Sequence, residues 1–468
     1  MEPDRQQQFD LIVLGGGPGG STVATLVAQQ GHRVLLLERE TFPRHQIGES
    51  LLPTTINGIC RLLGVTEELA QQNFPKKLGV SFLWGQSAEP WSFIFEDSPV
   101  LRRLGFNHAY QVERARFDEI LLRNAQRKGV DVRENHTAHD IVYEDGRFRG
   151  VCFTDASGHE HTALARHVVD ASGHRGAFVS RVGERVYSEF FRNIAVYGYF
   201  EGGKRFPPPR EGNVLSATFP YGWVWYIPLK DNLTSVGVII GLEFADKLKD
   251  EKEKVFLEMI DACPSVKELL GDTPLVREGM YGEIRIRKDW SYENTSFWKP
   301  GFSLVGDVAC FIDPFFSSGV HLATYAALQA ARAINTCLSG SDIDEQRCFD
   351  EFEARYRKEY RVFYELVQAF FELHVDEESY FWIARKILKT EGEETVEEAF
   401  LQLVAGSSQA KNDFATMAKA GGGTPEVFRD LVVAAEQQFG DSRPTEIPLF
   451  PGGLVPSEDG MHWREYAG

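Results

Sequence analysis

The sequence lacks any long apolar run. No hydrophobic stretch among its 468 residues approaches the roughly 18 to 20 residues that a membrane-spanning helix needs. The opening MEPDRQQQFD is polar and does not have the basic and then apolar pattern of a secretory leader. The sequence therefore predicts a cytoplasmic protein with no membrane partner.

Paired cysteines and metal-ligand spacings are also missing. The six cysteines are scattered, with no CxxC pair and no Cys/His cluster. This usage is typical of reduced thiols and does not indicate a zinc site. We therefore expect neither a disulfide nor a metal for Cys60, Cys152, Cys263, Cys310, Cys337 and Cys348.

Positive charge is scarce. Lys and Arg number 50 against 68 Asp and Glu, which gives a formal net charge of -18. Such a surface repels nucleic acid and anionic membranes. The composition predicts a small-molecule or protein partner.

A glycine-rich turn is the first strong positive signal. In FDLIVLGGGPGGSTVATLVAQQGHRVLLLERE, a buried strand leads into glycines at GxGxxG spacing, followed by a helix and a second strand that ends at Glu38. Gly15 permits the tight turn, Gly17 lets the backbone approach a pyrophosphate, and Gly20 lets helix and strand pack closely. Glu38 can accept from a ribose hydroxyl, and the pattern predicts a dinucleotide site.

Three further segments complete this unit and identify the nucleotide. A helix followed by a short strand is predicted in residues 111–132, a strand and glycine turn in 165–176, and a strand, Gly-Asp turn, loop and long apolar helix in 302–335. Together they resemble the FAD-containing monooxygenase superfamily. The resemblance implies FAD held in part by Asp307. No second GxGxxG is present for a nicotinamide cofactor.

Three motifs narrow the resemblance. IGESLLP (47–53), NFPKKLG (73–79) and GWVWYIP (222–228) resemble flavin-dependent halogenases, which carry a WxWxIP motif and a lysine before the sheet domain. DPFFSSGVHLA is similar to the chondrochloren halogenase-like type, which acts on carrier-tethered phenols or pyrroles. The resemblance implies a cofactor site of Gly15, Gly17, Gly20, Glu38, Arg39, Glu49, Ser50, Arg114 and Asp307.

The halogenase resemblance also assigns chemistry. It implies that FAD, used as FADH2, and oxygen convert chloride or bromide to hypohalous acid, a destructive oxidant that must be confined. Ser318 and Gly319 match the halide site, at a helix start whose N–H groups suit an anion. Trp223 and Trp225 match the pair that keeps substrate away from the flavin. Ordinary helix capping and sheet packing are the alternative interpretations.

A lysine is suited to handle hypohalous acid, by hydrogen bonding or as a haloamine. The family motif aligns best with Lys77, and Lys76 is the adjacent alternative. Neighbours on a strand face opposite sides, so only one of them can point inward. Two solvated surface lysines remain the other interpretation.

One position departs from the halogenases of free tryptophan. Their loop has a glutamate before the Ser/Thr pair, and Phe316 stands in its place here. The departure favours an electron-rich phenol or pyrrole, which loses its ring proton without a strong base.

The predicted fold class is α/β. A Rossmann-like FAD-binding domain, of the aromatic hydroxylase/glutathione reductase type, carries an inserted antiparallel β-sheet domain on the substrate side and a helical C-terminal region. The predicted boundaries are 1–80, 101–182 and 284–340 for the first, 81–100 and 183–283 for the second, and 341–468 for the third, with an irregular tail.

The predicted function is an FADH2-dependent halogenase of natural-product biosynthesis that acts on a free or carrier-bound phenol or pyrrole. A separate flavin reductase is the expected FADH2 source. The alternatives are an FAD- and NAD(P)H-dependent aromatic hydroxylase and a flavin-binding protein without halogenating activity. Docking of an acidic carrier needs a local basic patch, and the candidates are Arg285, Arg287, Lys288, Arg355, Arg357, Lys358 and Arg361.

Overall fold

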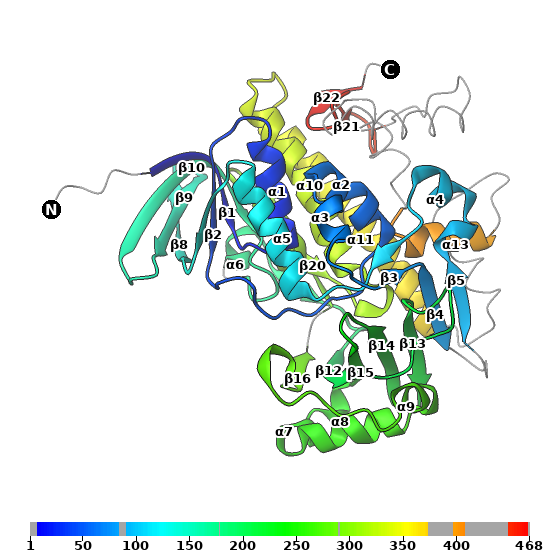
Figure 1. The fold of residues 1–468 in the computed structure, drawn as a ribbon. Coiled ribbons are helices and arrows are strands. Elements are labelled where there is room, and N and C mark those ends of the chain that lie inside the picture. The colour runs from blue at the N-terminus through cyan, green and yellow to red at the C-terminus, as the bar shows by residue number, and fades with distance from the viewer. Residues whose placement is uncertain are drawn as a thin grey trace.

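The computed structural model describes residues 7–83, 90–176, 178–288, 291–372, 396–407 and 448–466. Two large sheets organise them (Figure 1). The first lies in the body that carries the long helices, and the second lies below it in the view, with its own helices on the far side. The functional cavity described below lies between these two parts.

The main sheet is built around five parallel strands in the order β19, β10, β1, β2, β7. The strand β2 is buried throughout, as is the second half of β1, which is typical of a parallel sheet covered on both faces. Antiparallel strands extend the sheet at β18, β9 and β8. The bounds are β1 Gln7–Leu14, β2 Val34–Glu38, β7 Asp131–Glu134, β8 Thr137–Glu144, β9 Arg147–Thr154, β10 Glu160–Asp170, β18 Trp298–Lys299 and β19 Phe302–Leu304.

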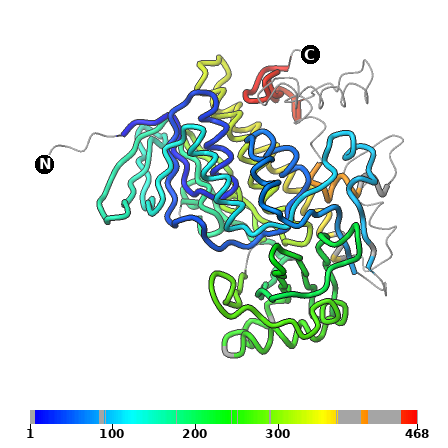
Figure 2. Tube along the Cα trace, in the orientation of Figure 1, coloured from blue at the N-terminus to red at the C-terminus, as the bar shows by residue number. Residues whose placement is uncertain are grey.

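Four helices pack in this body. The helix α1 follows β1 directly and contacts both α5 and α10, and α11 packs along α10. In Figure 2 the blue start of the chain and the yellow segment of α10 and α11 lie side by side, although some 300 residues separate them. Val320 to Thr336 of α10 are all buried, so this helix forms a central part of the core. The bounds are α1 Pro18–Ala28, α5 Arg114–Arg127, α10 Gly319–Leu338 and α11 Glu345–Glu372.

The second sheet has the order β16, β12, β15, β14, β13, β4, β5. All its pairs are antiparallel except β13 with β4, which are parallel because their connection crosses over. The expected antiparallel sheet is thus found with one parallel pair in it. The bounds are β4 Gly79–Leu83, β5 Trp91–Ile94, β12 Asn193–Glu201, β13 Val214–Phe219, β14 Gly222–Pro228, β15 Leu233–Gly241 and β16 Arg285–Lys288.

Strand β14 separates two hydrophobic cores. Trp223 and Trp225 pack into the main core, whereas Val224 and Tyr226 pack into a second core with the helices below the sheet. This is the alternation that the WxW spacing predicts. The helices on the far side are α7 Lys247–Asp250, α8 Lys252–Asp261 and α9 Pro264–Leu270.

Shorter elements connect these parts. Three small sheets contain β3 Lys76–Lys77 with β6 Ala109–Tyr110, β11 Arg185–Tyr187 with β17 Tyr292–Asn294 and β20 Cys310–Phe311, and β21 Leu454–Pro456 with β22 Trp463–Glu465. The remaining helices are α2 Arg61–Leu63, α3 Thr66–Ala70, α4 Pro99–Leu104, α6 Val179–Val182 and α13 Val396–Val404, with a π-helix over Thr54–Cys60 and 3-10 turns at Phe95–Asp97, Leu242–Phe244, Gly279–Tyr281, Gly306–Val308 and Pro314–Phe316.

The C-terminal region agrees with the sequence prediction in its helices but not in its tail. The helices α11 and α13 agree with the expected helical character, but the described tail contains the β21–β22 hairpin, which the Pro/Gly-rich sequence does not indicate. The glycine break expected near AGGGTP lies outside the described residues. The three domain boundaries stay predictions, and the pairing of β16 with β12 associates residues 285–288 with the second sheet.

All six cysteines are free thiols. In the part of the chain that the structure describes, no helix combines the length and the apolar character that crossing a bilayer requires.

Candidate active site

The glycine turn after β1 has the geometry of a phosphate cradle. Gly15 has φ +99°, and a Cβ there would lie 2.6 Å from the Ala171 carbonyl oxygen. A Cβ on Gly20 would lie 1.9 Å from the Gly15 oxygen, whereas one on Gly17 would meet only the Arg44 Nη2, at 3.7 Å. Gly15 and Gly20 are therefore required by packing, and Gly17 leaves open space at the start of α1. The residues present fit a dinucleotide pyrophosphate at this turn.

Glu38 holds the turn from the end of β2. Its Oε2 accepts from the Gly16 N–H at 2.7 Å and its Oε1 from the Glu40 N–H at 2.8 Å. The carboxylate is buried and also borders the cavity. The predicted ribose acceptor thus stands where the motif places it, and it orders the turn as well.

A cavity of about 840 Å³ runs from this turn to the second sheet. It contains most of the residues predicted for the site. Gly20, Lys77 and Ser318 do not line it. The predicted residues that do are Gly15, Gly17, Glu38, Arg39, Glu49, Ser50, Arg114, Trp223, Trp225, Asp307 and Gly319.

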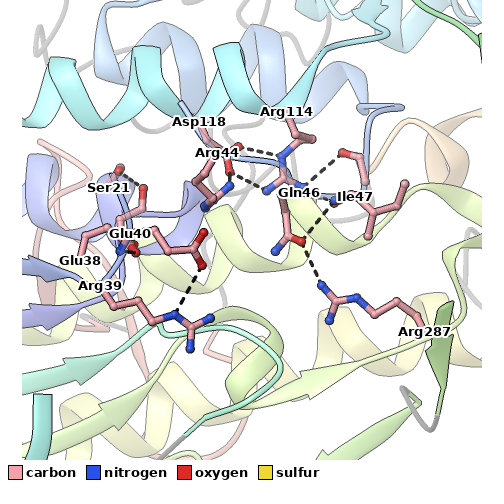
Figure 3. A network of polar contacts seen from close by, with 12 residues as sticks. Ser21, Glu38, Arg39, Glu40, Arg44, Gln46, Ile47, Arg114, Asp118 and Arg287 are labelled. Carbon is pink, nitrogen blue, oxygen red and sulfur yellow. Dashed lines mark hydrogen bonds and ion pairs between the residues drawn. The ribbon is translucent and has the colours of Figure 1, made fainter. Parts of the chain in front are cut away.

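A loop over residues 44–50 crosses the cavity and is fixed by a polar network (Figure 3). Arg114 on α5 donates to the Ile47 carbonyl at 2.6 Å and to both oxygens of Asp118, at 2.7 and 2.9 Å. Arg44 donates to the same Asp118 at 2.8 Å. Both arginines therefore share one buried carboxylate. Of these three residues, only Arg114 is predicted from the sequence. The i,i+4 spacing of Arg114 and Asp118 on a helix is the signal that could have revealed Asp118.

Glu49 is a buried acid in that loop. Burial raises the pKa of its carboxyl to about 7, and the nearby hydroxyls of Tyr199 and Ser235 oppose the shift. The Nε2 of His45 is hydrogen-bonded to the Tyr199 hydroxyl at 2.9 Å. Burial and the surrounding arginines lower the pKa of His45 to about 4, so this imidazole is neutral at neutral pH.

Lys77 lies directly behind the cavity wall. Its side chain is fully buried, whereas Lys76 is exposed, because successive residues of β3 face opposite sides. The Lys77 Nζ donates to the Ser50 Oγ at 2.9 Å and to the Leu51 carbonyl at 3.0 Å. Burial lowers the pKa of this ammonium group to about 7. Its catalytic role stays a prediction.

The tryptophan pair forms part of the wall on the side of the second sheet. The ring centres of Trp223 and Trp225 are 6.1 Å apart, and Trp223 meets Phe315 edge-on at 5.2 Å. The Trp225 Nε1 donates to the Ser235 Oγ at 3.3 Å, while the Trp223 Nε1 has no hydrogen-bond partner within the described residues. Both indoles are thus packed and also face the cavity.

The loop before α10 brings the predicted halide residues to the cavity in part. Ser317 has φ +59° and lines the cavity with Gly319, while Ser318 is buried at the N-cap of α10. Sequence reasoning misses Ser317. It also misses Asp313, a buried acid that accepts from the Phe315 N–H at 3.1 Å and whose pKa burial raises to about 7.

Phe316 occupies the place of the absent glutamate. Its ring is buried and lies 4.7 Å from Phe315, 6.0 Å from Phe82 and 6.4 Å from Phe400, measured between ring centres. The position is therefore part of an aromatic cluster, and no carboxylate could be exposed there without disrupting it.

The proposed basic docking patch is wrong for most of its members. Arg355 is buried and paired with Glu351 at 2.6 Å, and Arg357 is paired with Glu293 and Glu353. Arg285 and Arg287 line the cavity. Arg355 and Arg357 are thus engaged in ion pairs and Arg285 and Arg287 face the cavity, which leaves Lys288, Lys358 and Arg361 as the exposed members. Within the described residues, no group of His, Cys, Asp and Glu side chains could hold a metal ion.

Comparison with known proteins identifies the family. The sequence matches the tryptophan halogenase family over residues 10–101 and 97–424. It is 34% identical over 406 residues to a tryptophan 2-halogenase of Chondromyces crocatus, covering 85% of this chain and 75% of that protein. It is also 34% identical over 374 residues to the flavin-dependent halogenase gsfI of Penicillium aethiopicum, covering 73% and 68%.

A solved structure agrees with these relatives. The myxobacterial chondrochloren halogenase CndH, described as a new variant of FAD-dependent halogenases, is 54% identical with a TM-score of 0.79, covering 98% of this chain and all of that one. Between the functional alternatives, these matches favour the halogenase over the hydroxylase and the non-halogenating flavoprotein. The chain belongs to the flavin-dependent halogenases, enzymes that use FAD and a halide to halogenate an aromatic substrate.

Proposed function

We propose that this enzyme takes FADH2 from a separate reductase, oxidises chloride or bromide to hypohalous acid and transfers the halogen to an electron-rich phenol or pyrrole. The observation that carries the proposal is the position of Lys77. A fully buried lysine without a carboxylate partner in the described residues is rare, and its Nζ contacts the cavity-lining Ser50.

FAD would be held by Gly15, Gly17, Glu38, Arg44 and Asp307, which line one continuous cavity. When bound in its reduced form, the flavin supplies the electrons that activate oxygen. Gly17 leaves space for the pyrophosphate. Asp307 follows Gly306, whose φ of +81° forms the Gly-Asp turn. The protein binds and orients the cofactor through these groups.

Lys77 would hold hypohalous acid away from the flavin. Its pKa of about 7 means that both the ammonium and the free amine are populated at neutral pH. The ammonium can donate a hydrogen bond to hypohalous acid, and the amine can form a haloamine. Trp223 and Trp225 narrow the cavity on the other side and exclude organic substrate from the flavin.

Phe316 supports a substrate that needs no strong base. Its ring packs among Phe82, Phe315 and Phe400 and provides no carboxylate at this position to remove a proton. A phenol or pyrrole donates electron density into its own ring and loses the displaced proton readily. The halogen adds to a ring carbon, the O–X bond breaks, and the ring proton leaves with the hydroxide as water.

The test is product mass spectrometry with an FADH2-regenerating system, chloride or bromide, and matched phenols and pyrroles offered free and loaded on a carrier protein. A product with the halogen isotope pattern is expected on this panel. Absence of any halogenated phenol or pyrrole, together with halogenation of free tryptophan, would overturn the substrate assignment. Faster turnover of the loaded members would show that the substrate is carrier-bound.

A further inference from the structure

Arg287 brings a positive charge into the cavity from the second sheet. It lies on β16, where Arg285 and Arg287 are half-buried and line the cavity, while Lys288 is exposed and does not. The same strand therefore presents two cations to the cavity and a neighbouring cation, Lys288, to solvent. Lys288 therefore serves as the control residue for Arg287.

The guanidinium of Arg287 makes a hydrogen bond to a neutral amide and, in the part of the chain that the structure describes, no direct ion pair. Its Nη2 donates to the amide Oε1 of Gln46 at 3.0 Å across the cavity (Figure 3), and no ion pair joins it to an acid among the described residues. Three other cavity arginines lie close to acids. Arg44 and Arg114 share Asp118, and Arg39 lies 3.5 Å from Glu40.

Arg287 enters the cavity from β16, whereas Arg44 enters it from the 44–50 loop. Arg44 lies at the glycine turn, where its Nη2 is 3.7 Å from the place that a Cβ on Gly17 would take. Arg287 lies close enough to Asp307 to affect its carboxyl. Burial raises the pKa of that carboxyl, and Arg287 opposes the shift more than Arg114 or Arg185 does. Asp307, Trp225 and Phe315 line the same cavity, and the flavin ring system would occupy the part beside the tryptophan pair.

We propose that Arg287 makes the enzyme selective for reduced over oxidised FAD, because its guanidinium, which no direct ion pair within the described chain neutralises, supplies positive charge beside the place that the flavin ring system would take. Reduced flavin loses its N1 proton near neutral pH and then carries one negative charge more than oxidised flavin. A fixed cation in a partly desolvated cavity favours that extra charge.

Such selectivity matters for an enzyme with a net charge of -18 that receives its flavin from another protein. The overall field repels an anionic ligand, and a local cation has to offset it for the reduced form. The inference rests on the proposed use of FADH2 as a diffusing cosubstrate. It concerns binding, so it can be measured without halide, oxygen or aromatic substrate.

The test is an anaerobic titration of the protein with oxidised FAD and with dithionite-reduced FAD. Arg287→Gln should weaken binding of reduced FAD about ten-fold more than binding of oxidised FAD, which lowers the potential of the bound two-electron couple by about 30 mV. Arg287→Lys keeps the charge and should keep most of the selectivity. Lys288→Gln should match the wild type.

Gln46→Ala separates charge from the loop contact. It removes the partner of Arg287 but leaves the guanidinium, so the preference for reduced FAD should persist. Equal weakening of both redox forms by Arg287→Gln, or loss of selectivity in Gln46→Ala, would overturn the proposal and assign Arg287 to loop positioning. Retained redox selectivity in an enzyme that halogenates no phenol or pyrrole would refute the proposed substrate class and leave this inference standing.

Discussion

Lys77 donates a 2.9 Å hydrogen bond from Nζ to the Ser50 Oγ, and this contact joins a fully buried lysine to the wall of the flavin cavity. Ser50 forms an isolated β-bridge with Gln111. The strand β6, which ends directly before Gln111, pairs with β3, the strand that carries Lys77. Lys77 and the 44–50 loop are thus both fixed to residues 109–111.

Lys77→Ala should separate oxygen chemistry from halogen transfer. The variant should keep bound FAD and keep consuming oxygen with FADH2, because Lys77 does not line the flavin cavity. Halogenated product should fall about 100-fold or more, within the range that a positioned acid–base group supplies. Hydroxylated product should not replace it, since the tryptophan wall remains. Oxygen uptake and product mass spectrometry on the same sample measure both effects.

The exposed Lys76 provides the control, and Lys76→Ala should lose little activity. Lys77→Arg retains a charged donor but cannot form a haloamine, because guanidinium does not deprotonate. Residual halogenation in Lys77→Arg would indicate hydrogen-bonded hypohalous acid. Near-normal halogenation by Lys77→Ala would falsify the role assigned to this lysine.

Gly17 and Gly20 should respond differently to the same substitution. A side chain at Gly17 points into open space, so Gly17→Val should fold and lose FAD, giving a colourless protein. A Cβ at Gly20 collides with the Gly15 carbonyl oxygen at 1.9 Å, so Gly20→Val should lose soluble protein. Flavin absorbance after purification and circular dichroism distinguish the two. Stoichiometric FAD in Gly17→Val would contradict the cradle.

The sequence predicts those parts of the site that depend on local spacing. The glycine turn and Glu38 follow from the GxGxxG fingerprint and the strand after it, and the two faces of β14 follow from the strand period of 2. The opposite burial of Lys76 and Lys77 follows from the same strand alternation. In these cases the positions of neighbours in the chain determine the geometry.

Contacts between distant segments could not be predicted in this way. The basic residues of β16 read as a surface run, because nothing in IRIRK shows that Arg287 faces Gln46, which lies 241 positions away. Arg355 and Glu351 are four residues apart on a helix and could suggest a solvated pair, yet the tail strand β21 covers them through the Leu454 carbonyl. In both cases a contact with a remote segment determines where the arginine side chain lies.

Trp223→Phe should test the shielding role without a large loss of stability. The Trp223 Nε1 has no hydrogen-bond partner in the described residues, so a phenyl ring leaves no polar atom unpaired. The destabilisation should stay below that of Trp223→Ala, which removes a buried indole at a cost of about 3–5 kcal/mol. If the indole shields the flavin, the smaller ring should let hydroxylated product appear beside the halogenated one.

Trp225→Phe is the comparison for that experiment. It removes the hydrogen bond from Nε1 to Ser235 and should cost about 1 kcal/mol more than the loss of ring area. Urea unfolding gives the stability of each variant, and mass spectrometry gives the ratio of hydroxylated to halogenated product. An unchanged ratio in both folded variants would assign the pair to packing.

Burial of Lys77 should make stability depend on pH in a defined window. The pKa of this group is lowered to about 7 in the folded protein, against about 10.4 in an unfolded chain. Between these values the unfolded state binds more protons, so the free energy of unfolding should rise with pH, by at most about 1.4 kcal/mol per unit from this group. Below pH 7 both states are protonated and the slope from Lys77 vanishes.

Lys77→Met removes this contribution while filling a similar volume. The difference in unfolding free energy between the wild type and Lys77→Met should therefore grow in favour of the wild type as the pH rises from 7 to 9. Urea unfolding at fixed ionic strength measures it. Lys76→Met changes an exposed lysine on the same strand and should follow the wild-type slope. Parallel pH profiles for the wild type and Lys77→Met would mean that Lys77 keeps its proton in the folded protein, and a neutral amine would then have no part in halogen transfer.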